Sequence, residues 1–407
     1  MTKCRTAVLG LCMLMILRGV ESFAEGERPW AFSIGATEGF DDNRDGAANN
    51  KESNIETRIV PRADYKLYRD RFDFDFYYAP QLLLRSNPRD VAGWSQKSME
   101  LYHDIGLDIV NRWSERLVLN GTEDFTLSDM PADMDASRTF HEFVNYWVNR
   151  VNVSATYALL PERASVTVSG SHLLKKYQDA PFANIGDEKS SGAGVSSRYM
   201  LRSGWTVLGD ISYNTSDLGE SRSGLSRSDD VVFWGVGVER VFGLWSARMR
   251  VGADMSSFDV SGVAAGIGSV VWSGSNTEPG GELEVGYTSD SGMSSVGFAV
   301  KYHTIRSDIT PFATQQRTSA DVKVGHSFSE RVRLGLDGVY AQGEYSSAPG
   351  VQGGSDAVAG IAATLTYAWN RNLSLDATYR FEDWKADDNI RESYRRNLGA
   401  LGLKAQF

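Results

Sequence analysis

Residues 72–82 read FDFDFYYAPQL, and this stretch decides the fold of the chain. Side chains of an extended strand point alternately to its two faces, so one face of this segment collects Phe72, Phe74, Phe76, Tyr78 and Leu82. The opposite face collects Asp73, Asp75, Tyr77 and Gln81. The segment therefore predicts a β-strand with one apolar face and one wet face.

Similar alternation recurs through most of the chain, and the joints between the segments narrow the fold further. Short joints lie at 69–71, 111–116, 160–163, 202–204, 241–243, 288–292, 329–331 and 370–372. Long connections, most of them rich in Gly, Ser, Asp and Asn, lie at 41–54, 85–98, 129–139, 175–191, 215–229, 256–280, 303–317, 342–355 and 383–394. Short turns at one end and long loops at the other are typical of outer-membrane barrels. We predict an all-β chain, a transmembrane antiparallel up-and-down β-barrel of about 18 strands over residues 25–407.

Residues 1–24 resemble a secretory signal peptide and set the expected compartment. Lys3 and Arg5 precede an apolar run over 7–17, and small residues complete a cleavage site near Ala24. The run is too short to cross a bilayer as a helix, and no later stretch approaches the required length of about 18 apolar residues. We therefore expect export, cleavage of the signal peptide and a location in the bacterial outer membrane.

Composition argues against several classes of protein. The formal charge of −10 becomes −12 without residues 1–24, so nucleic acid is a poor expectation for a partner. Both cysteines, Cys4 and Cys12, lie in the signal segment, so the mature chain would have no disulfide, thiolate metal site or cysteine nucleophile. The histidines are scattered, and no metalloprotease motif or phosphate-binding glycine loop accompanies them. We do not expect an enzyme.

Aromatic residues lie next to the short joints, where a membrane barrel needs them. They are Trp113, Trp205, Phe242, Trp245, Phe328, Trp369 and Phe407. Aromatic rings at the level of the lipid headgroups form a girdle that fixes the depth of a barrel. Outer-membrane lipid is therefore an expected partner.

The chain ends NLGALGLKAQF, with Leu403 and Phe407 on one face of the last predicted strand. This ending resembles the C-terminal signal by which the bacterial assembly machinery recognises outer-membrane proteins. We expect Leu403 and Phe407 to act in assembly rather than in transport.

A family resemblance rests on three segments. FSIGATEGFDDN (32–43) and SNIETRIVPRADY (53–65) resemble the start of the putative β-barrel porin 2 family. VNVSATYALLPERASVTV (151–168), a strand, a tight turn and a strand, is similar to hairpins of that family. Members are often associated with exopolysaccharide-export operons. The resemblance therefore implies a barrel in that context, with a periplasmic polysaccharide-export protein and polysaccharide as partners, and it identifies no binding residue.

The wet faces of the strands predict a water-filled lumen, because about 18 strands enclose more space than side chains fill. Residues expected to face this lumen are Arg58, Arg62, Asp73, Asp75, Tyr77, Tyr102, Asp104, Arg248, Arg250, Asp376 and Arg380. The inward charges of the whole barrel are nearly balanced in sign, which argues against strong ion selectivity. These side chains either solvate a wide lumen and pair across strands, or form a carbohydrate conduit in which Tyr77 and Tyr102 offer stacking surfaces.

One loop carries a sharper motif. DDNRDG at 41–46, followed by Glu52, has the spacing of an EF-hand calcium loop, with Asp41, Asn43, Asp45 and Glu52 as oxygen ligands. Strands rather than helices border the loop, and Asp, Asn and Gly are common in exposed hairpin turns. Calcium is the one cofactor that the sequence suggests, and an ordinary solvated loop is the other interpretation.

The longest connection, 256–280, differs from the others because it is apolar in part and carries few charges. Spread out in water it would expose an unusual apolar patch. We expect it either to extend the strands above the membrane or to fold inward and narrow the lumen.

Three functions are compatible with this sequence. The first is a channel for exopolysaccharide secretion that works with periplasmic and inner-membrane export components. The alternative is a general or small-solute diffusion porin, and a structural or adhesive surface barrel comes third.

Overall fold

The computed structural model describes residues 29–44, 48–49, 51–88, 90–91, 94–95, 97–128, 145–178, 187–202, 204–219, 224–264, 268–307, 312–346, 352–387, 390 and 392–407. The predicted signal peptide at 1–24 and the predicted cleavage site lie outside these residues. Within the described ranges, no helix has the length and apolar character of a membrane span.

The described chain is built from strands. Those of the main sheet are β1 (Trp30–Asp41), β2 (Asn54–Arg69), β3 (Phe72–Arg85), β6 (Met99–Asn111), β7 (Leu117–Ser128), β8 (Tyr146–Leu160), β9 (Ala164–Tyr177), β10 (Glu188–Met200), β11 (Trp205–Leu218), β12 (Leu225–Phe242), β13 (Trp245–Ala264), β14 (Gly268–Thr288), β15 (Ser294–Arg306), β16 (Thr314–Ser327), β17 (Val332–Tyr345), β18 (Ser355–Ala368), β19 (Leu373–Ala386) and β20 (Tyr394–Gln406). The remaining two, β4 (Asp90–Val91) and β5 (Trp94–Ser95), form a small hairpin in the connection predicted at 85–98.

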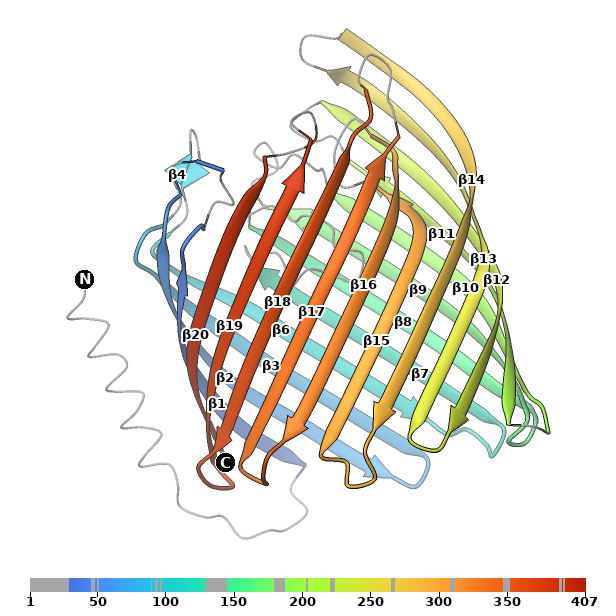
Figure 1. The fold of residues 1–407 in the computed structure, drawn as a ribbon, viewed down its shortest axis with the longest axis horizontal. Coiled ribbons are helices and arrows are strands. Elements are labelled where there is room, and N and C mark those ends of the chain that lie inside the picture. The colour runs from blue at the N-terminus through green and yellow to red at the C-terminus, as the bar shows by residue number, and fades with distance from the viewer. Residues whose placement is uncertain are drawn as a thin grey trace.

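The main sheet has 18 strands and closes on itself, which confirms the predicted architecture. Each strand pairs antiparallel with the next along the chain, and β20 pairs antiparallel with β1 from Ser33↔Gln406 to Asp41↔Leu398. Around the part of the described barrel where all 18 strands run side by side, closure pairs each strand on both sides, and unpaired N–H and C=O groups in hydrocarbon would cost several kcal/mol each. Figure 1 shows the resulting cylinder of tilted strands, with the C-terminus at the end where β1 begins.

All the predicted short joints are turns at that same end of the barrel. One of the two shortest, each of two residues, joins β12 to β13 through Gly243 and Leu244. Gly243 has a φ of +60°, a backbone conformation that costs little only without a Cβ atom. The opposite end carries the long connections, as the sequence predicts for the extracellular side.

The outer face of the barrel is apolar and exposed, as a lipid-facing surface must be. Large apolar side chains with high exposure include Val168, Val195, Ile211, Trp234, Val236, Met249, Val251, Ile361, Leu365 and Leu401. An apolar belt of this extent is rare on a protein that meets only water. The predicted girdle residues Trp113, Trp205, Phe242, Trp245, Phe328, Trp369 and Phe407 are exposed as well.

Residues 256–264 and 268–280 are strand rather than loop. β13 and β14 continue past their neighbours as one hairpin, with pairs at Ser256↔Asn276, Val260↔Trp272 and Ala264↔Gly268, and this hairpin rises highest in Figure 1. The expected extension of the strands is therefore correct, and inward folding is wrong for this segment. Strands also run into most of the other long connections predicted from the sequence, while 129–139 lies outside the described residues.

Candidate functional site

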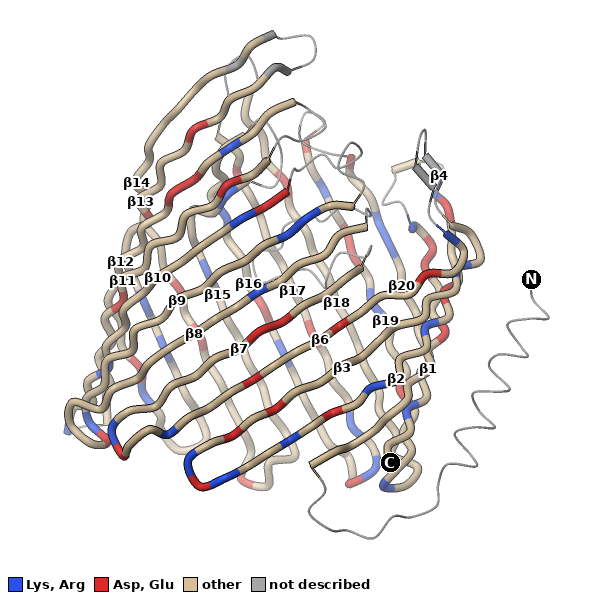
Figure 2. The backbone as a smooth tube through the Cα atoms, turned by 180° about the vertical axis from the view of Figure 1, so that it is seen from behind, with Lys and Arg blue, Asp and Glu red and all other residues tan. Residues whose placement is uncertain are grey.

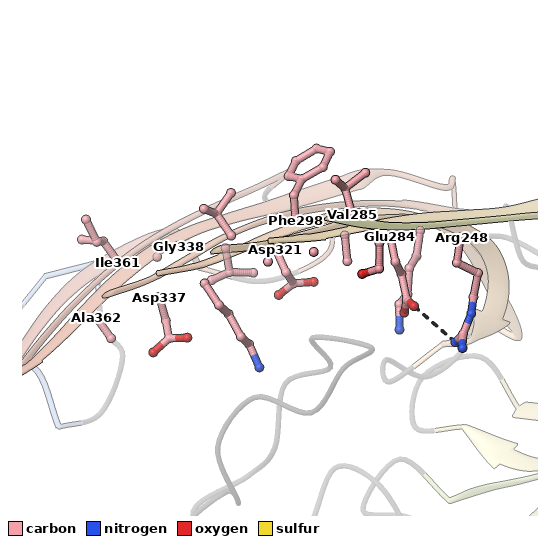
Figure 3. A pocket seen from close by; sticks show the side chains of 18 of the residues that line it. Arg248, Glu284, Val285, Phe298, Asp321, Asp337, Gly338, Ile361 and Ala362 are labelled. Carbon is pink, nitrogen blue, oxygen red and sulfur yellow. Dashed lines mark hydrogen bonds and ion pairs between the residues drawn. The ribbon is translucent and has the colours of Figure 1, made fainter. Parts of the chain in front are cut away.

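The lumen is the candidate functional site, and strand register decides which side chains reach it. In Figure 3, Asp321 and Asp337 point to the concave side of the wall, whereas Phe298 and Ile361 point to the opposite side. Alternation and cross-strand pairing extend this division around the barrel. The inward set contains Arg58, Arg62, Asp73, Asp75, Tyr77, Tyr102, Asp104, Arg248, Arg250, Asp376 and Arg380. Their part in transport stays a prediction.

One side of the lumen has polar side chains without charge. Two rows of inward positions cross β7 to β11, and they line a recess of about 260 Å³. We call this surface the neutral wall; its members are Asn120, Thr122, Asn152, Ser154, Ser169, Ser171, Gly192, Gly194, Ser212 and Asn214. Its amides and hydroxyls both donate and accept hydrogen bonds.

The two glycines of the neutral wall make room for their neighbours. A Cβ atom on Gly192 would collide with Asn214 Oδ1 and would lie 2.7 Å from Ser171 Oγ. Nearby, Asn152 Nδ2 donates to Thr122 Oγ1 at 3.2 Å. The polar groups thus form a continuous lining across neighbouring strands, and Gly192 is the position where a larger residue would break it.

The other side of the lumen is charged. A recess of about 1000 Å³ lies along β13 to β19, and we call its charged lining the charged wall. Its members are Arg248, Glu284, Lys301, Asp321, Lys323, Asp337 and Arg380, together with Glu239 of the adjoining β12. Arg248 contacts Glu284 at 3.4 Å, the dashed line of Figure 3, and also Glu239 at 2.9 Å.

The two walls face each other across the barrel. Figure 1 draws β15 to β20 in front and β7 to β10 behind. Seen from behind in Figure 2, β9 and β10 stay tan through their middle portions, because no Lys, Arg, Asp or Glu lies between residues 164 and 174 or between 190 and 197. A molecule in the lumen would therefore meet fixed charges on one side and neutral hydrogen-bonding groups on the other.

The stacking role expected for Tyr77 and Tyr102 stays a prediction, which the neighbours of the two rings do not support. The Tyr77 ring lies close to Gly106, and the Arg62 guanidinium lies 4.0 Å from the centroid of the ring. Tyr102 is buried, with Arg85 as a neighbour. The alternation of the sequence correctly places both tyrosines on the inward face. It does not show that an arginine lies next to each ring.

The predicted calcium loop has arginine partners. Arg396 Nε donates to both carboxylate oxygens of Asp41 at 3.0 Å, and Arg44 contacts Glu52 at 2.7 Å. Asn43 donates through Nδ2 to the carbonyl of Arg395 at 2.8 Å. A cation would have to displace these contacts. The fourth predicted ligand, Asp45, lies outside the described residues. Calcium binding therefore stays a prediction, and the contacts do not support it.

Comparison with known proteins supports the barrel class over part of the chain. The sequence model of the family described as putative beta-barrel porin 2 matches residues 289–407, which contain β15 to β20. The family resemblance is confirmed for this part. The three segments between residues 32 and 168 that suggested the resemblance lie outside the match. No curated protein matches the chain.

Two solved structures illustrate the similarity at the level of whole barrels. The outer membrane protein opdK from Pseudomonas aeruginosa is 10% identical, with a TM-score of 0.43, over 93% of this chain and 99% of that chain. OccAB3 from Acinetobacter baumannii is 10% identical, with a TM-score of 0.43, over 93% of this chain and 98% of that chain. The closed barrel and the apolar belt, together with the match of residues 289–407 to a porin family, make this chain an outer-membrane β-barrel.

Proposed function

We propose that this barrel is a conduit through which an exopolysaccharide crosses the outer membrane, working with periplasmic and inner-membrane export components. The neutral wall is the main support for this proposal. A sugar chain presents hydroxyl groups that donate and accept hydrogen bonds, and the side chains of Asn152, Ser154, Ser171 and Asn214 match them in kind. Because each such bond replaces one to water, its net contribution is only about 1 kcal/mol, so a chain can hold to the wall and still move.

The charged wall supports the proposal in a second way. Arg248 pairs with Glu239 and Glu284, so its charge is compensated within the wall. Paired charges keep the lumen hydrated without attracting ions of one sign. A neutral or weakly charged polymer then meets no large electrostatic barrier on this side.

The outer surface, the last strand and the short-turn end of the barrel each suggest a partner. The exposed apolar belt would contact outer-membrane lipid, and Leu403 and Phe407 would be read by the assembly machinery. A periplasmic polysaccharide-export protein would dock at the end of the barrel that carries the short turns and deliver the chain.

A small-solute diffusion porin is the second candidate, and burial at the extracellular end favours it. Phe312, Ala313 and Gln315 next to the β15–β16 connection are almost inaccessible. Packing of this kind narrows the space at that end, where a small solute passes more easily than a polymer.

Deleting the gene from its host separates the two functions. The conduit proposal expects secreted polysaccharide to fall sharply while uptake of small sugars is unchanged, and expects the full-length chain to restore secretion. A complementing variant that assembles but has Ser154→Asp and Ser171→Asp on the neutral wall should restore it poorly. Normal secretion in the deletion strain, with slower growth on a small nutrient, would reject the conduit and favour the porin.

A further inference from the structure

β15 leaves the barrel wall before it ends. Its pairing with β14 stops at Gly281↔Tyr302, while its pairing with β16 continues to Arg306↔Thr314. β14 meanwhile continues upward with β13 alone. The extracellular ends of these two hairpins therefore separate, and we call the described residues 303–307 and 312–317 of the β15–β16 end the inner arm.

The inner arm runs along the inside of its neighbours. The backbone N–H of Thr304 donates to Asp254 Oδ2 of β13 at 3.1 Å, and His303 Nδ1 lies 3.1 Å from the same oxygen. The His303 ring also packs edge-on against Phe233 of β12, with centroids 5.6 Å apart. Asp254 and Phe233 both belong to the inward sets of their strands, so the arm passes through the interior.

A glycine permits this close approach. A Cβ atom on Gly280 of β14 would lie 2.6 Å from Asp254 Oδ2 and 2.9 Å from His303 Nδ1. Any other residue at 280 would push His303 away from the wall. The neighbouring Gly281 points outward, and a Cβ atom there would approach only Arg250 O at 3.2 Å and Val251 Cγ1 at 3.9 Å within the same radius.

Two arginines fasten the inner arm to the far strands. Arg227 of β12 donates through Nη1 to the carbonyl of Phe312 and through Nη2 to the carbonyl of Ser307, each at 2.7 Å. Arg306 of the arm donates to Glu188 Oε1 of β10 at 2.8 Å and also to Ser216 Oγ of β11. Five strand spacings, roughly 24 Å along the wall, separate β15 from β10, so this contact is made across the interior. We call these contacts the clasp.

The inner arm is packed on its other side too. Phe312, Ala313, Thr314 and Gln315 expose 1%, 0%, 7% and 1% of their surfaces, which is far less than an open loop would. Phe312 belongs to a buried cluster against which Trp272 of the β13–β14 hairpin packs. The inner arm is therefore packed into the extracellular part of the lumen beside β10 to β15.

We propose that the inner arm is a gate that closes the extracellular half of the lumen, and that the clasp holds it shut. This inference does not depend on which molecule the barrel carries. The clasp uses charge-assisted hydrogen bonds, which are stronger than neutral ones but are weakened by salt where they are partly exposed. Opening requires the arm to exchange these bonds for water while the barrel wall stays intact.

Single-channel recording in a planar bilayer tests the gate. Arg306→Gln removes one of the two positive charges of the clasp and leaves Arg227 in place, and we expect it to raise the conductance or the open fraction severalfold. Exchanging the charges, with Arg306→Glu and Glu188→Arg together, should bring conductance back toward the native level. Arg198→Gln is the matched control, because Arg198 lies on β10 and pairs with Glu239 without touching the arm.

A second pair of variants acts from the opposite side of the arm. Gly280→Ala should raise conductance in the same way, since its methyl group displaces His303, whereas Gly281→Ala should not. Heat-modifiable migration on a gel confirms that each barrel is folded. Native conductance in folded Arg306→Gln and Gly280→Ala, or an equal rise in Arg198→Gln and Gly281→Ala, would overturn the proposal.

Discussion

The neutral wall and the charged wall occupy equivalent inward positions of one barrel, yet the polar groups that they present to the lumen differ. On the charged wall Arg248 is paired with Glu239 and Glu284, so fixed charges hold one another in place. On the neutral wall Asn152 and Thr122 contact each other without charge. Charges organise ions and water, whereas amides and hydroxyls exchange hydrogen bonds with a passing molecule at low net energy. The composition of each wall, rather than the polarity of the lumen as a whole, therefore determines which groups a solute contacts.

Opening the barrel would destroy both walls at once and should have the largest effect. Phe407 closes the seam, since its N–H donates to the carbonyl of Phe32 at 2.8 Å. Deleting Phe407 should sharply lower the amount of folded protein in the outer membrane, measured by heat-modifiable migration. Phe407→Trp keeps the aromatic end and should assemble. Normal levels of the deletion variant would show that the last residue has no role in assembly.

Placing charge on the neutral wall should remove its difference from the charged wall. Ser154→Asp with Ser171→Asp puts two carboxylates in the recess. An ionised carboxylate accepts hydrogen bonds but cannot donate them, and it gives up its bound water at a cost. Losing the two hydroxyl donors, worth about 1 kcal/mol each, should weaken binding of a neutral oligosaccharide by about tenfold or more, measured as block of the ion current. Ser154→Thr with Ser171→Thr keeps the hydroxyls and serves as the control. Equal block in both variants would contradict a binding role for this wall.

Removing positive charge from the charged wall should change ion preference without changing sugar binding. Lys301→Gln with Lys323→Gln leaves Asp321 and Asp337 in the same recess. The reversal potential in a salt gradient should then shift toward cation selectivity, because the lumen has lost two positive charges. Block by a neutral oligosaccharide should stay at its native level. A change in sugar block as large as the change in selectivity would show that the walls do not act separately.

Breaking one ion pair of the charged wall should have the smallest effect. Arg248 is about one-third exposed (33%), so its pairs with Glu239 and Glu284 are screened by water. Arg248→Ala should lower the free energy of unfolding in lipid by no more than about 1 kcal/mol, measured by urea titration. A loss of several kcal/mol would mean that the charged wall is a structural element rather than a lining of the lumen.

The barrel is predictable from the sequence because the membrane requires apolar side chains at every lipid-facing position of each strand. Phe74 and Phe76 must face lipid and Asp75 must not, so alternation reports orientation residue by residue. The short turns are equally local, as Gly243 illustrates. The neutral wall also left a signal, since Asn, Ser, Thr or Gly fills every second position at 120–122, 152–154, 169–171, 192–194 and 212–214, but its meaning appears only once the strands are aligned side by side.

The extracellular end is not predictable in the same way, because no membrane constrains it there. Residues 256–280 and 303–317 read as loops, yet the first is a paired hairpin and the second contains the inner arm. Arg227 and Ser307 meet only through the three-dimensional path of the chain. The same holds for Tyr77, whose stacking face is taken by Arg62.

A carbohydrate path through the lumen is tested most directly by current block with neutral oligosaccharides of increasing length in a planar bilayer. The block should be recorded with the native chain and with Arg306→Gln, so that a closed inner arm does not hide the lumen. We expect transient blocks whose duration grows with oligosaccharide length, because more hydroxyl groups then contact the neutral wall. A steady current without block at any length, in channels that are open and folded, would contradict the claim that this lumen is a path for carbohydrate.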